Sequence, residues 1–420
     1  MKHLLLLLTS CLLFPASGFP QVTLQPWVQV FGTMNGQELG KNVTGITPSA
    51  NFPYRAAVSK NGSTSVYQLN PPTDTSAQIV FPGENLLTGD LNGDGYTDVV
   101  VTRTVNFVDT VIVYWGIQGG IDTANGLRIP GEAQSDRFQA AIIADVNNDG
   151  FKDLVIKADE YGPAQGKVYF HFGPLISAVP NAVVVGDSTL SRLGLAVAVG
   201  DLNDDSSNDL IIRGAYNAGP TGEWYDYVNI YWGVGLDTLD LDLDVQLRGY
   251  RLTSAGLACF DANGDSIDDL LWTNRDTLDW VYVHYGGAAF DTLPSLRLRD
   301  PQFALYGNAI ANAGDMNGDG YYDVVVGAYA SITSGFVFVY GGGPTIDQYF
   351  DAAVGMSSDS YFGWSISSIG DVSSDGLSDI IVGAPNYEFG SDKGYWGIFL
   401  GNSSIGVSDV NNTQFLEGAT

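Results

Sequence analysis

Short runs of apolar, mostly aliphatic residues recur along the chain at a regular interval. Continuous apolar runs of this length predict buried strands. A second kind of run follows each one after about 10–18 residues, with aromatic and aliphatic residues alternating up to a glycine, as in Val111–Trp115 before Gly116. The first kind comprises Val99–Val101, Leu154–Ile156, Leu210–Ile212, Leu270–Trp272, Val324–Val326 and Ile380–Val382.

Two further strands complete each unit. A small or apolar stretch precedes each apolar run, as at 138–143, and a more variable strand follows the aromatic one, as at 182–185. Six units start 55, 56, 60, 54 and 56 residues apart, and four strands per repeat of this length are typical of β-propeller blades. The sequence therefore predicts an all-β, seven-bladed β-propeller of four-stranded antiparallel blades, since about 402 residues contain seven such periods.

The seventh blade is a degenerate copy of the repeat at the start of the chain, over about residues 27–80. Residues 39–46 and 54–58 resemble its first two strands, and residues 28–31 resemble an extra strand that could close the ring against the blade beginning near Tyr361. We expect the other blades to begin near residues 84, 137, 192, 253, 305 and 361.

An acidic nine-residue loop joins the first and second predicted strands of these six blades. Oxygen-bearing side chains at positions 1, 3, 5 and 9, with a turn after position 5, are suited to a hard cation such as Ca²⁺. We therefore expect up to six Ca²⁺ ions. These candidate ligands are Asp90, Asn92, Asp94 and Asp98; Asp145, Asn147, Asp149 and Asp153; Asp201, Asn203, Asp205 and Asp209; Asp261, Asn263, Asp265 and Asp269; Asp315, Asn317, Asp319 and Asp323; and Asp371, Ser373, Asp375 and Asp379.

In the degenerate blade, Thr47, Ser49 and Asn51 occupy positions 1, 3 and 5 and provide no carboxylate, so we expect no Ca²⁺ there. Other calcium motifs fit the six acidic loops less well. An EF-hand needs Glu at position 12 between two helices, whereas position 12 is apolar in all six loops. Dockerin-like modules also flank their loops with helices. Six copies in register argue against a surface loop that is merely rich in Asp.

These units resemble FG-GAP repeats, the blade type of the integrin α-subunit N-terminal propeller. The last blade contains Phe362-Gly363 before its loop and Gly383-Ala384-Pro385 after it, and Tyr306-Gly307 and Leu193-Gly194 are weaker forms. The resemblance covers about residues 27–410. It implies calcium in many blades and a role in extracellular binding or adhesion.

The resemblance also implies that position 7 offers its backbone carbonyl to the metal. Ser206 and Ser266 depart from the pattern by replacing the turn glycine, and Ser373 replaces the usual Asn or Asp. No inserted metal-binding domain lies between the blades. The position-7 residues are Tyr96, Phe151, Ser207, Ile267, Tyr321 and Leu377.

The N-terminus predicts export. Lys2-His3, the apolar run 4–14 and Ala16-Ser17-Gly18 are typical of a signal peptide over residues 1–18, which leaves the propeller over 19–420. A lipid on Cys11 is the alternative, so the expected location is secreted or cell-surface. Only Cys259 remains after cleavage, so no intrachain disulfide can form, and bound metal would take over that stabilising role.

Charge narrows the partners. A formal net charge of −29 disfavours nucleic acid and anionic membranes. We expect an extracellular protein or glycan ligand, bound by loops on the face opposite the acidic loops. Aromatic candidates there are at 160–161, 224–227, 280 and 387–389; packing between blades is the alternative role for them.

Two other functional interpretations remain open. The chain could be a structural module of an envelope or matrix assembly, or a non-catalytic domain of a secreted hydrolase-type system. We expect no catalysis by the chain itself, because it has no nucleophile or metalloprotease motif. His171 and His284 both lie in aromatic strands, where packing between blades is their expected role.

Overall fold

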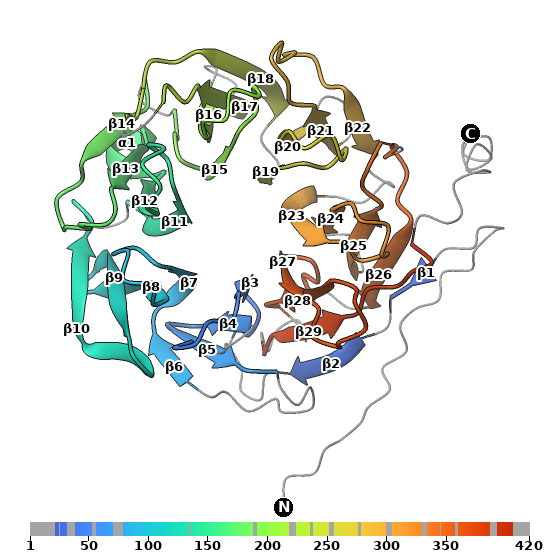
Figure 1. The fold of residues 1–420 in the computed structure, drawn as a ribbon, viewed down its shortest axis with the longest axis horizontal. Coiled ribbons are helices and arrows are strands. Elements are labelled where there is room, and N and C mark those ends of the chain that lie inside the picture. The colour runs from blue at the N-terminus through green and yellow to red at the C-terminus, as the bar shows by residue number, and fades with distance from the viewer. Residues whose placement is uncertain are drawn as a thin grey trace, which may run out of the picture.

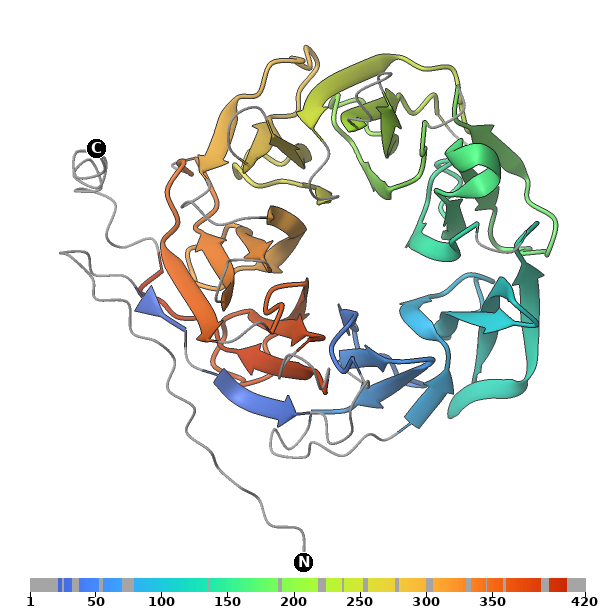
Figure 2. The same cartoon turned by 180° about the vertical axis from the view of Figure 1, so that it is seen from behind.

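Seven β-sheets form a ring in the computed structural model of this protein (Figures 1 and 2). The structure describes residues 22–24, 26–31, 38–52, 56–69, 79–133, 136–187, 191–217, 224–235, 238–251, 256–275, 279–299, 305–329, 334–344, 346–357, 360–386 and 393–405. Each sheet runs outward from an inner strand that faces the axis of the ring. The prediction of a seven-bladed propeller with four-stranded antiparallel blades is confirmed.

The strands follow the chain around the ring, blade by blade. The first three blades contain β3 (Val43–Gly45), β4 (Ala56–Lys60), β5 (Ser63–Tyr67) and β6 (Ile79–Pro82); β7 (Glu84–Gly89), β8 (Asp98–Val105), β9 (Val108–Ile117) and β10 (Gly120–Pro130); and β11 (Phe138–Ala144), β12 (Asp153–Ala158), β13 (Lys167–His171) and β14 (Ala182–Val185), with the short helix α1 (Tyr161–Ala164) between β12 and β13. The next two contain β15 (Ala196–Gly200), β16 (Asp209–Asn217), β17 (Trp224–Tyr231) and β18 (Val245–Arg251); and β19 (Leu257–Phe260), β20 (Asp269–Arg275), β21 (Asp279–His284) and β22 (Leu296–Arg299). The sixth contains β23 (Tyr306–Gly314), β24 (Asp323–Ala328), β25 (Ser334–Tyr340) and β26 (Ala352–Ser357), and the seventh contains β27 (Ser365–Gly370), β28 (Asp379–Ala384) and β29 (Tyr395–Phe399).

The ring is closed by the N-terminal part of the chain. Strand β2 (Pro26–Phe31) pairs antiparallel with β29 and supplies the outer strand of the seventh blade. The closure expected from residues 28–31 is therefore confirmed. Strand β1 (Val22–Thr23), which the sequence pattern did not indicate, adds to the sixth blade by pairing parallel with β26. Figure 1 shows both strands on the outside of neighbouring blades.

The hydrophobic core is divided into seven clusters, one at each interface between neighbouring blades. At the closing interface, for example, Val58 and Tyr67 of the first blade pack with Ile381 and Trp396 of the seventh. A single blade cannot bury both faces of its sheet, so each blade depends on its two neighbours. This arrangement explains why the second and third strands are apolar on both faces.

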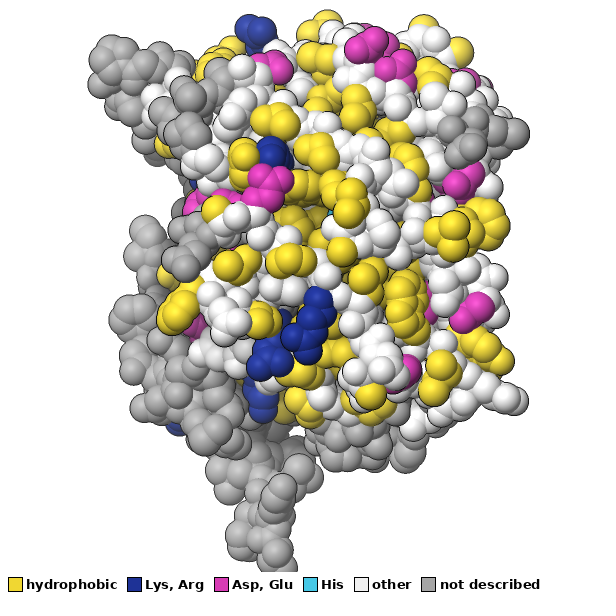
Figure 3. Space-filling model, turned by 90° about the vertical axis from the view of Figure 1, so that its left-hand side faces the viewer, with side chains coloured by type: hydrophobic (Ala, Val, Ile, Leu, Met, Phe, Trp, Pro, Cys, Tyr) yellow, Lys and Arg dark blue, Asp and Glu magenta, His cyan; other side chains and the backbone are white. Residues whose placement is uncertain are grey.

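The outer wall has a different character. On the side of the ring where β10 and β14 lie, hydrophobic side chains are scattered among polar ones, with a group of Lys and Arg side chains between them (Figure 3).

No helix in the described part of the chain is long and apolar enough to cross a membrane. The predicted signal peptide, Cys11 and residues 387–389 lie outside the described residues. The signal peptide and the blade boundaries stay predictions.

Candidate metal loops and the opposite rim

The six acidic loops all lie on one rim of the ring. Each loop connects the end of an inner strand to the start of the second strand of the same blade. Because all blades run in the same sense around the axis, equivalent connections lie on the same side. We call this side the acidic rim and the other side the opposite rim.

Backbone amides hold the loops in one shared conformation. In all six, the position-1 carboxylate accepts hydrogen bonds from the N–H groups of positions 5 and 6, as Asp90 does from Asp94 and Gly95. The position-5 carboxylate accepts one from the N–H of position 7, as Asp94 does from Tyr96 at 2.8 Å. Side-chain oxygens at positions 1 and 5 are thereby held on the same turn.

The position-9 aspartate is buried beneath each loop. Asp98 is 0% exposed; its Oδ2 accepts a hydrogen bond from Leu91 N at 2.8 Å and its Oδ1 accepts one from Gly116 N at 2.7 Å. The same two bonds occur in the other five loops. This side chain therefore ties the loop to the end of the third strand.

Burial shifts the titration of these aspartates. It raises the pKa of Asp98 to about 6 and that of Asp153 to about 7; backbone hydrogen bonds oppose the shift, and the carboxylates at positions 5 and 1 add to it. The pKa values of the remaining four are likewise raised, chiefly by burial, to about 6 for Asp209, Asp269 and Asp379 and to about 7 for Asp323. On the acidic rim, negatively charged side chains thus lie close to a carboxylate that is desolvated by burial.

A glycine at the end of the third strand is required where that strand approaches the acidic loop. A Cβ on Gly116 would lie 2.5 Å from the carbonyl oxygen of Thr97, and one on Gly233 would lie 2.5 Å from that of Asn208. A side chain there would push the strand away from the loop. The sequence pattern showed these glycines but not their purpose.

Two of the departures lie at the turn position, where the backbone is left-handed. Gly95 has φ = 83°, and Ser206 and Ser266 adopt the same left-handed conformation with φ = 68° and 73°. A residue with a Cβ is strained in this region. These two loops therefore hold the shared conformation at a higher conformational cost.

The donor set of each loop consists of oxygens alone, which suits Ca²⁺. Positions 3 and 5 are also brought together, since Asn92 Nδ2 donates to Asp94 Oδ2 at 3.0 Å. Both oxygens of the position-9 carboxylate accept hydrogen bonds from backbone amides. Over the described residues, no three acidic, His or Cys side chains converge as a metal-binding group. The residue types fit the ion, and the ligand sets derived from the sequence stay a prediction.

The loop of the first blade, which we call the Thr47 loop, is held by neutral hydrogen bonds. Asn51 is 4% exposed. Its Nδ2 donates to the carbonyl oxygens of Thr97 and Gly120 at 3.1 and 3.2 Å, and its Oδ1 accepts from Thr97 N at 3.0 Å. Ser49 Oγ accepts a further bond from Thr97 Oγ1. The loop without carboxylates is thus bonded directly to the neighbouring acidic loop.

Contacts of this kind recur around the acidic rim through position 8. Asn208 donates from Nδ2 to Asp145 O at 2.8 Å, and Ser378 N donates to Asp315 O at 2.7 Å. Asp268 accepts from Asp201 N at 3.1 Å. Position 8, which the sequence reasoning passed over, therefore links loops of successive blades.

Both histidines of the described chain are buried, each with 1% exposure. His284 accepts a hydrogen bond at Nε2 from Trp272 Nε1 at 3.1 Å and stacks between Trp272 and Phe290. Nδ1 of His171 lies 2.8 Å from Ser177 O. Burial lowers the pKa of both rings. Neither ring faces a solvent-filled cleft.

The aromatic candidates on the opposite rim are engaged in packing. Tyr161 is partly buried and lies under Lys167 Nζ, 3.7 Å from the ring centre. Trp280 packs against the cluster between the fourth and fifth blades. Trp224 lies 5.6 Å from the Arg192 guanidinium. Packing therefore accounts for much of their surface.

A cavity of about 860 Å³ lies on the opposite rim. Most of its lining comes from the starts of the inner strands β3, β7, β11, β15 and β27 and the ends of β8 and β12, with Asp109 of β9 and Gly62 besides. Strands from five blades meet at only one place in such a ring, the mouth of the central channel. The sequence reasoning missed this cavity, since its lining residues are far apart along the chain.

Comparison with known families identifies the repeats. Residues 90–156 match a family model described as FG-GAP-like repeat, and residues 362–395 match one described as FG-GAP repeat. Two stretches of this seven-bladed β-propeller thus match FG-GAP repeats, and the resemblance inferred from the sequence is confirmed.

Curated relatives include integrin α-subunits. The chain is 30% identical to integrin alpha-5 of Xenopus laevis over 215 residues and to integrin alpha-8 of Gallus gallus over 233 residues, which covers 46% and 48% of this chain. It is also 30% identical over 170 residues to the phosphatidylinositol-glycan-specific phospholipase D of Bos taurus, with 34% of this chain covered. The chain spans about a fifth of the length of each of these relatives, 20% in all three cases.

Proposed function

We propose that this protein is a secreted, calcium-binding β-propeller that acts as an extracellular binding or adhesion module for a protein or glycan ligand. The similarity to integrin α-subunits supports a binding role for the propeller. The observation that carries the proposal is the division between the two rims. Six acidic loops occupy one rim, and the cavity lies on the other.

Calcium would be held by positions 1, 3, 5 and 9 of each acidic loop, together with the position-7 carbonyl. The ion would neutralise the repulsion that contributes to the raised pKa of the buried position-9 aspartate. The export predicted from the N-terminus would supply this ion, since extracellular calcium is plentiful, and after the predicted cleavage only Cys259 would remain, so that no intrachain disulfide could form.

The opposite rim would then receive the ligand. Binding there leaves the calcium loops free to stabilise the scaffold, so that a rigid ring presents the cavity without rearrangement. A retention assay tests this division. Labelled protein is passed over extracellular matrix or cell-wall material in millimolar Ca²⁺, with variants on each rim.

Substitution of an exposed residue on the opposite rim, such as Arg103→Glu, should reduce retention while the melting temperature stays unchanged. Tyr322→Ser, at an exposed site on the acidic rim, is the matched control and should be retained like the wild type. Retention that is equal for both variants would contradict the proposal. Sedimentation of the pure protein in Ca²⁺ tests the assembly alternative, which requires self-association.

The similarity to a phospholipase D favours a second candidate, in which the chain is the non-catalytic propeller of a larger hydrolase system. We propose no catalytic residue in the chain itself. His171→Gln and His284→Gln should alter stability alone, because both rings are buried. Hydrolysis of glycosylphosphatidylinositol by the purified chain, lost in either variant, would reverse this view.

A further inference from the structure

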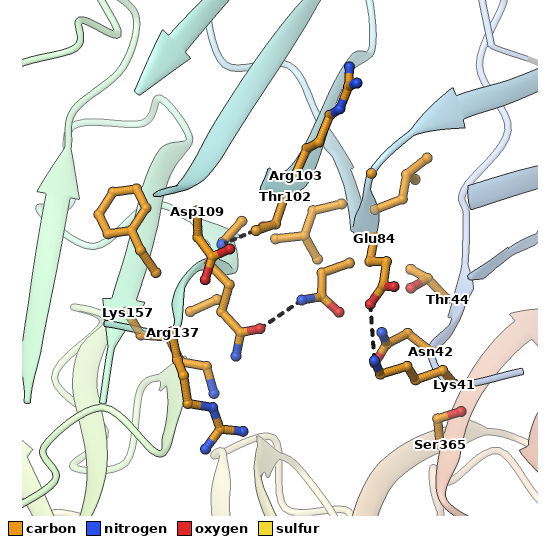
Figure 4. A pocket seen from close by; sticks show the side chains of 18 of the residues that line it. Lys41, Asn42, Thr44, Glu84, Thr102, Arg103, Asp109, Arg137, Lys157 and Ser365 are labelled. Carbon is orange, nitrogen blue, oxygen red and sulfur yellow. Dashed lines mark hydrogen bonds and ion pairs between the residues drawn. The ribbon is translucent and has the colours of Figure 1, made fainter. Parts of the chain in front are cut away.

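The cavity on the opposite rim concentrates positive charge in a strongly acidic protein. Four of the 18 Lys and Arg residues of the chain line it, against two acidic residues, Glu84 and Asp109. Figure 4 shows Arg137 and Lys157 on one side of the cavity and Lys41, paired with Glu84, on the other. The four cationic residues are Lys41, Arg103, Arg137 and Lys157.

Lys157 stands out among them because it lacks a carboxylate partner. Its Nζ donates to Leu195 O at 2.6 Å, and it belongs to none of the ion pairs of the described residues. Burial lowers its pKa, and the guanidinium groups of Arg137 and Arg192 add to this effect while Asp159 opposes it. An anion beside Nζ would supply the missing charge partner.

Arg137 lies beside a network with a surplus of positive charge. Asp159 is held at 2.6 Å by Arg192, whereas its distance to Arg137 Nη1 is 3.4 Å. Glu160 lies 3.4 Å from Arg137 and 3.3 Å from Arg192. Two carboxylates therefore face three cations once Lys157 is counted. The Arg137 side chain is 54% exposed, so its planar guanidinium can reach a further anion.

Besides these charges and several apolar side chains, the lining offers neutral hydrogen-bonding groups. Asn85 Nδ2 donates to Gln139 Oε1 at 2.8 Å, and Trp364 stacks on Tyr361 at the edge of the same cavity. Amide and hydroxyl side chains both donate and accept, which suits the hydroxyl groups of a sugar. The neutral polar side chains are Asn42, Thr44, Asn85, Thr102, Thr104, Gln139 and Ser365.

From these observations we infer that the mouth of the central channel binds an anionic saccharide, with Arg137 and Lys157 at its acidic group. The inference rests on the proposed role of the propeller as an extracellular binding module. The volume of about 860 Å³ lies within the range of about 300–1,000 Å³ usual for ligand sites. A carboxylated and a sulfated sugar share the required chemistry.

Calorimetric titration of the full chain in millimolar Ca²⁺ tests the inference with four probes of similar length. Tetragalacturonate carries carboxylates, a heparin-derived tetrasaccharide carries sulfates, maltotetraose is neutral, and tetraglutamate is an acidic peptide. We expect one or both anionic saccharides to bind at least about tenfold more tightly than maltotetraose and tetraglutamate. The tighter of the two identifies the source of the acidic group.

Variants then locate the site. Arg137→Gln and Lys157→Gln should each weaken the anionic saccharide about tenfold. Arg128→Gln is the matched control, because it removes the same charge from an exposed residue on the outer strand β10, away from the cavity. Its affinity should equal that of the wild type. If Lys157→Gln does not fold, Arg137→Gln alone decides.

The inference is overturned if maltotetraose or tetraglutamate binds as tightly as the anionic saccharides, if Arg128→Gln weakens binding as much as Arg137→Gln, or if no probe binds. The retention assay distinguishes failure of the saccharide inference from failure of the proposed binding function. Retention on matrix material without binding of either anionic saccharide rejects the saccharide alone. Absence of both rejects the binding module as well.

Discussion

The Thr47 loop and the acidic loop at Asp90 are neighbours on one rim and hold the same place in their blades. One uses a buried neutral amide, Asn51, bonded to the next blade. The other has three aspartates along its nine residues, one of them buried. The difference shows that the propeller needs a stable turn at this place in every blade, and that the turn can be stabilised either by hydrogen bonds or, as we propose, by a cation.

Removal of calcium should have the largest effect on this comparison. Extracellular calcium modules have Kd values on the order of 10⁻⁴–10⁻³ M, so each site contributes roughly 0.5–1.5 kcal/mol in millimolar Ca²⁺. Six sites would together contribute several kcal/mol. We expect chelation to lower the melting temperature by roughly 5–15 °C, as measured by calorimetry. A melting curve indifferent to chelator would show that the acidic loops are no more dependent on metal than the Thr47 loop.

The stability of the folded protein should depend most strongly on pH when calcium is absent. The pKa values of the position-9 aspartates are raised by burial to about 6 or 7, above the ordinary value, so the folded state binds protons more tightly than the unfolded state. Stability of the metal-free protein should therefore fall as pH rises from about 4 to 7.

Bound calcium favours the ionised carboxylates and should reduce or reverse this dependence. Melting temperatures measured across that window, with calcium and with chelator, give the two slopes. Equal slopes in both buffers would contradict a metal role for the buried aspartates.

Single substitutions should separate the two kinds of loop. Asn51→Ala removes four hydrogen bonds and should destabilise the fold by about 1–3 kcal/mol, with or without calcium. Asp94→Ala should destabilise by about 1 kcal/mol in millimolar Ca²⁺ because it removes a ligand. It should have little effect in chelator, because the relief of repulsion offsets the loss of the hydrogen bonds from Tyr96 N and Asn92 Nδ2. Urea denaturation of both variants in both buffers is the measurement. A calcium-dependent effect of Asn51→Ala would mean that the Thr47 loop also responds to metal.

The smallest effect concerns the turn position. Ser206→Gly and Ser266→Gly should each stabilise the protein by up to about 1 kcal/mol, since glycine adopts the left-handed conformation without strain. Gly95→Ser is the reciprocal control and should lose a similar amount. Thermal denaturation of the three variants measures the sign. Destabilisation by both Ser→Gly changes would show that the serine side chains make contacts worth more than the strain.

Much of the fold could be predicted because its signals are local and repeated. The acidic loops, the apolar second strands and the aromatic third strands each lie within one blade, and the count of seven followed from their spacing. Ring closure by β2 was also foreseeable, since residues 28–31 had no blade of their own. The parallel pairing of β1 was not, because two residues carry too little pattern.

The opposite rim could not be derived in this way. The cationic residues of its cavity are Lys41, Arg103, Arg137 and Lys157, which come from three different blades and share no motif. The partners of Asn51 were equally hidden, since Thr97 lies 46 residues further along the chain. Sequence patterns report strands and loops, whereas the contacts between blades depend on how the ring brings them together.

The number of calcium ions bound is the most direct test of the central claim. Equilibrium dialysis in millimolar Ca²⁺ followed by elemental analysis should find up to six ions per chain, with about one fewer in Asp94→Ala or Asp319→Ala. Asn51→Ala should retain the wild-type number. Absence of bound calcium in the wild type, or loss of an ion in Asn51→Ala, would contradict the division between the Thr47 loop and the acidic loops.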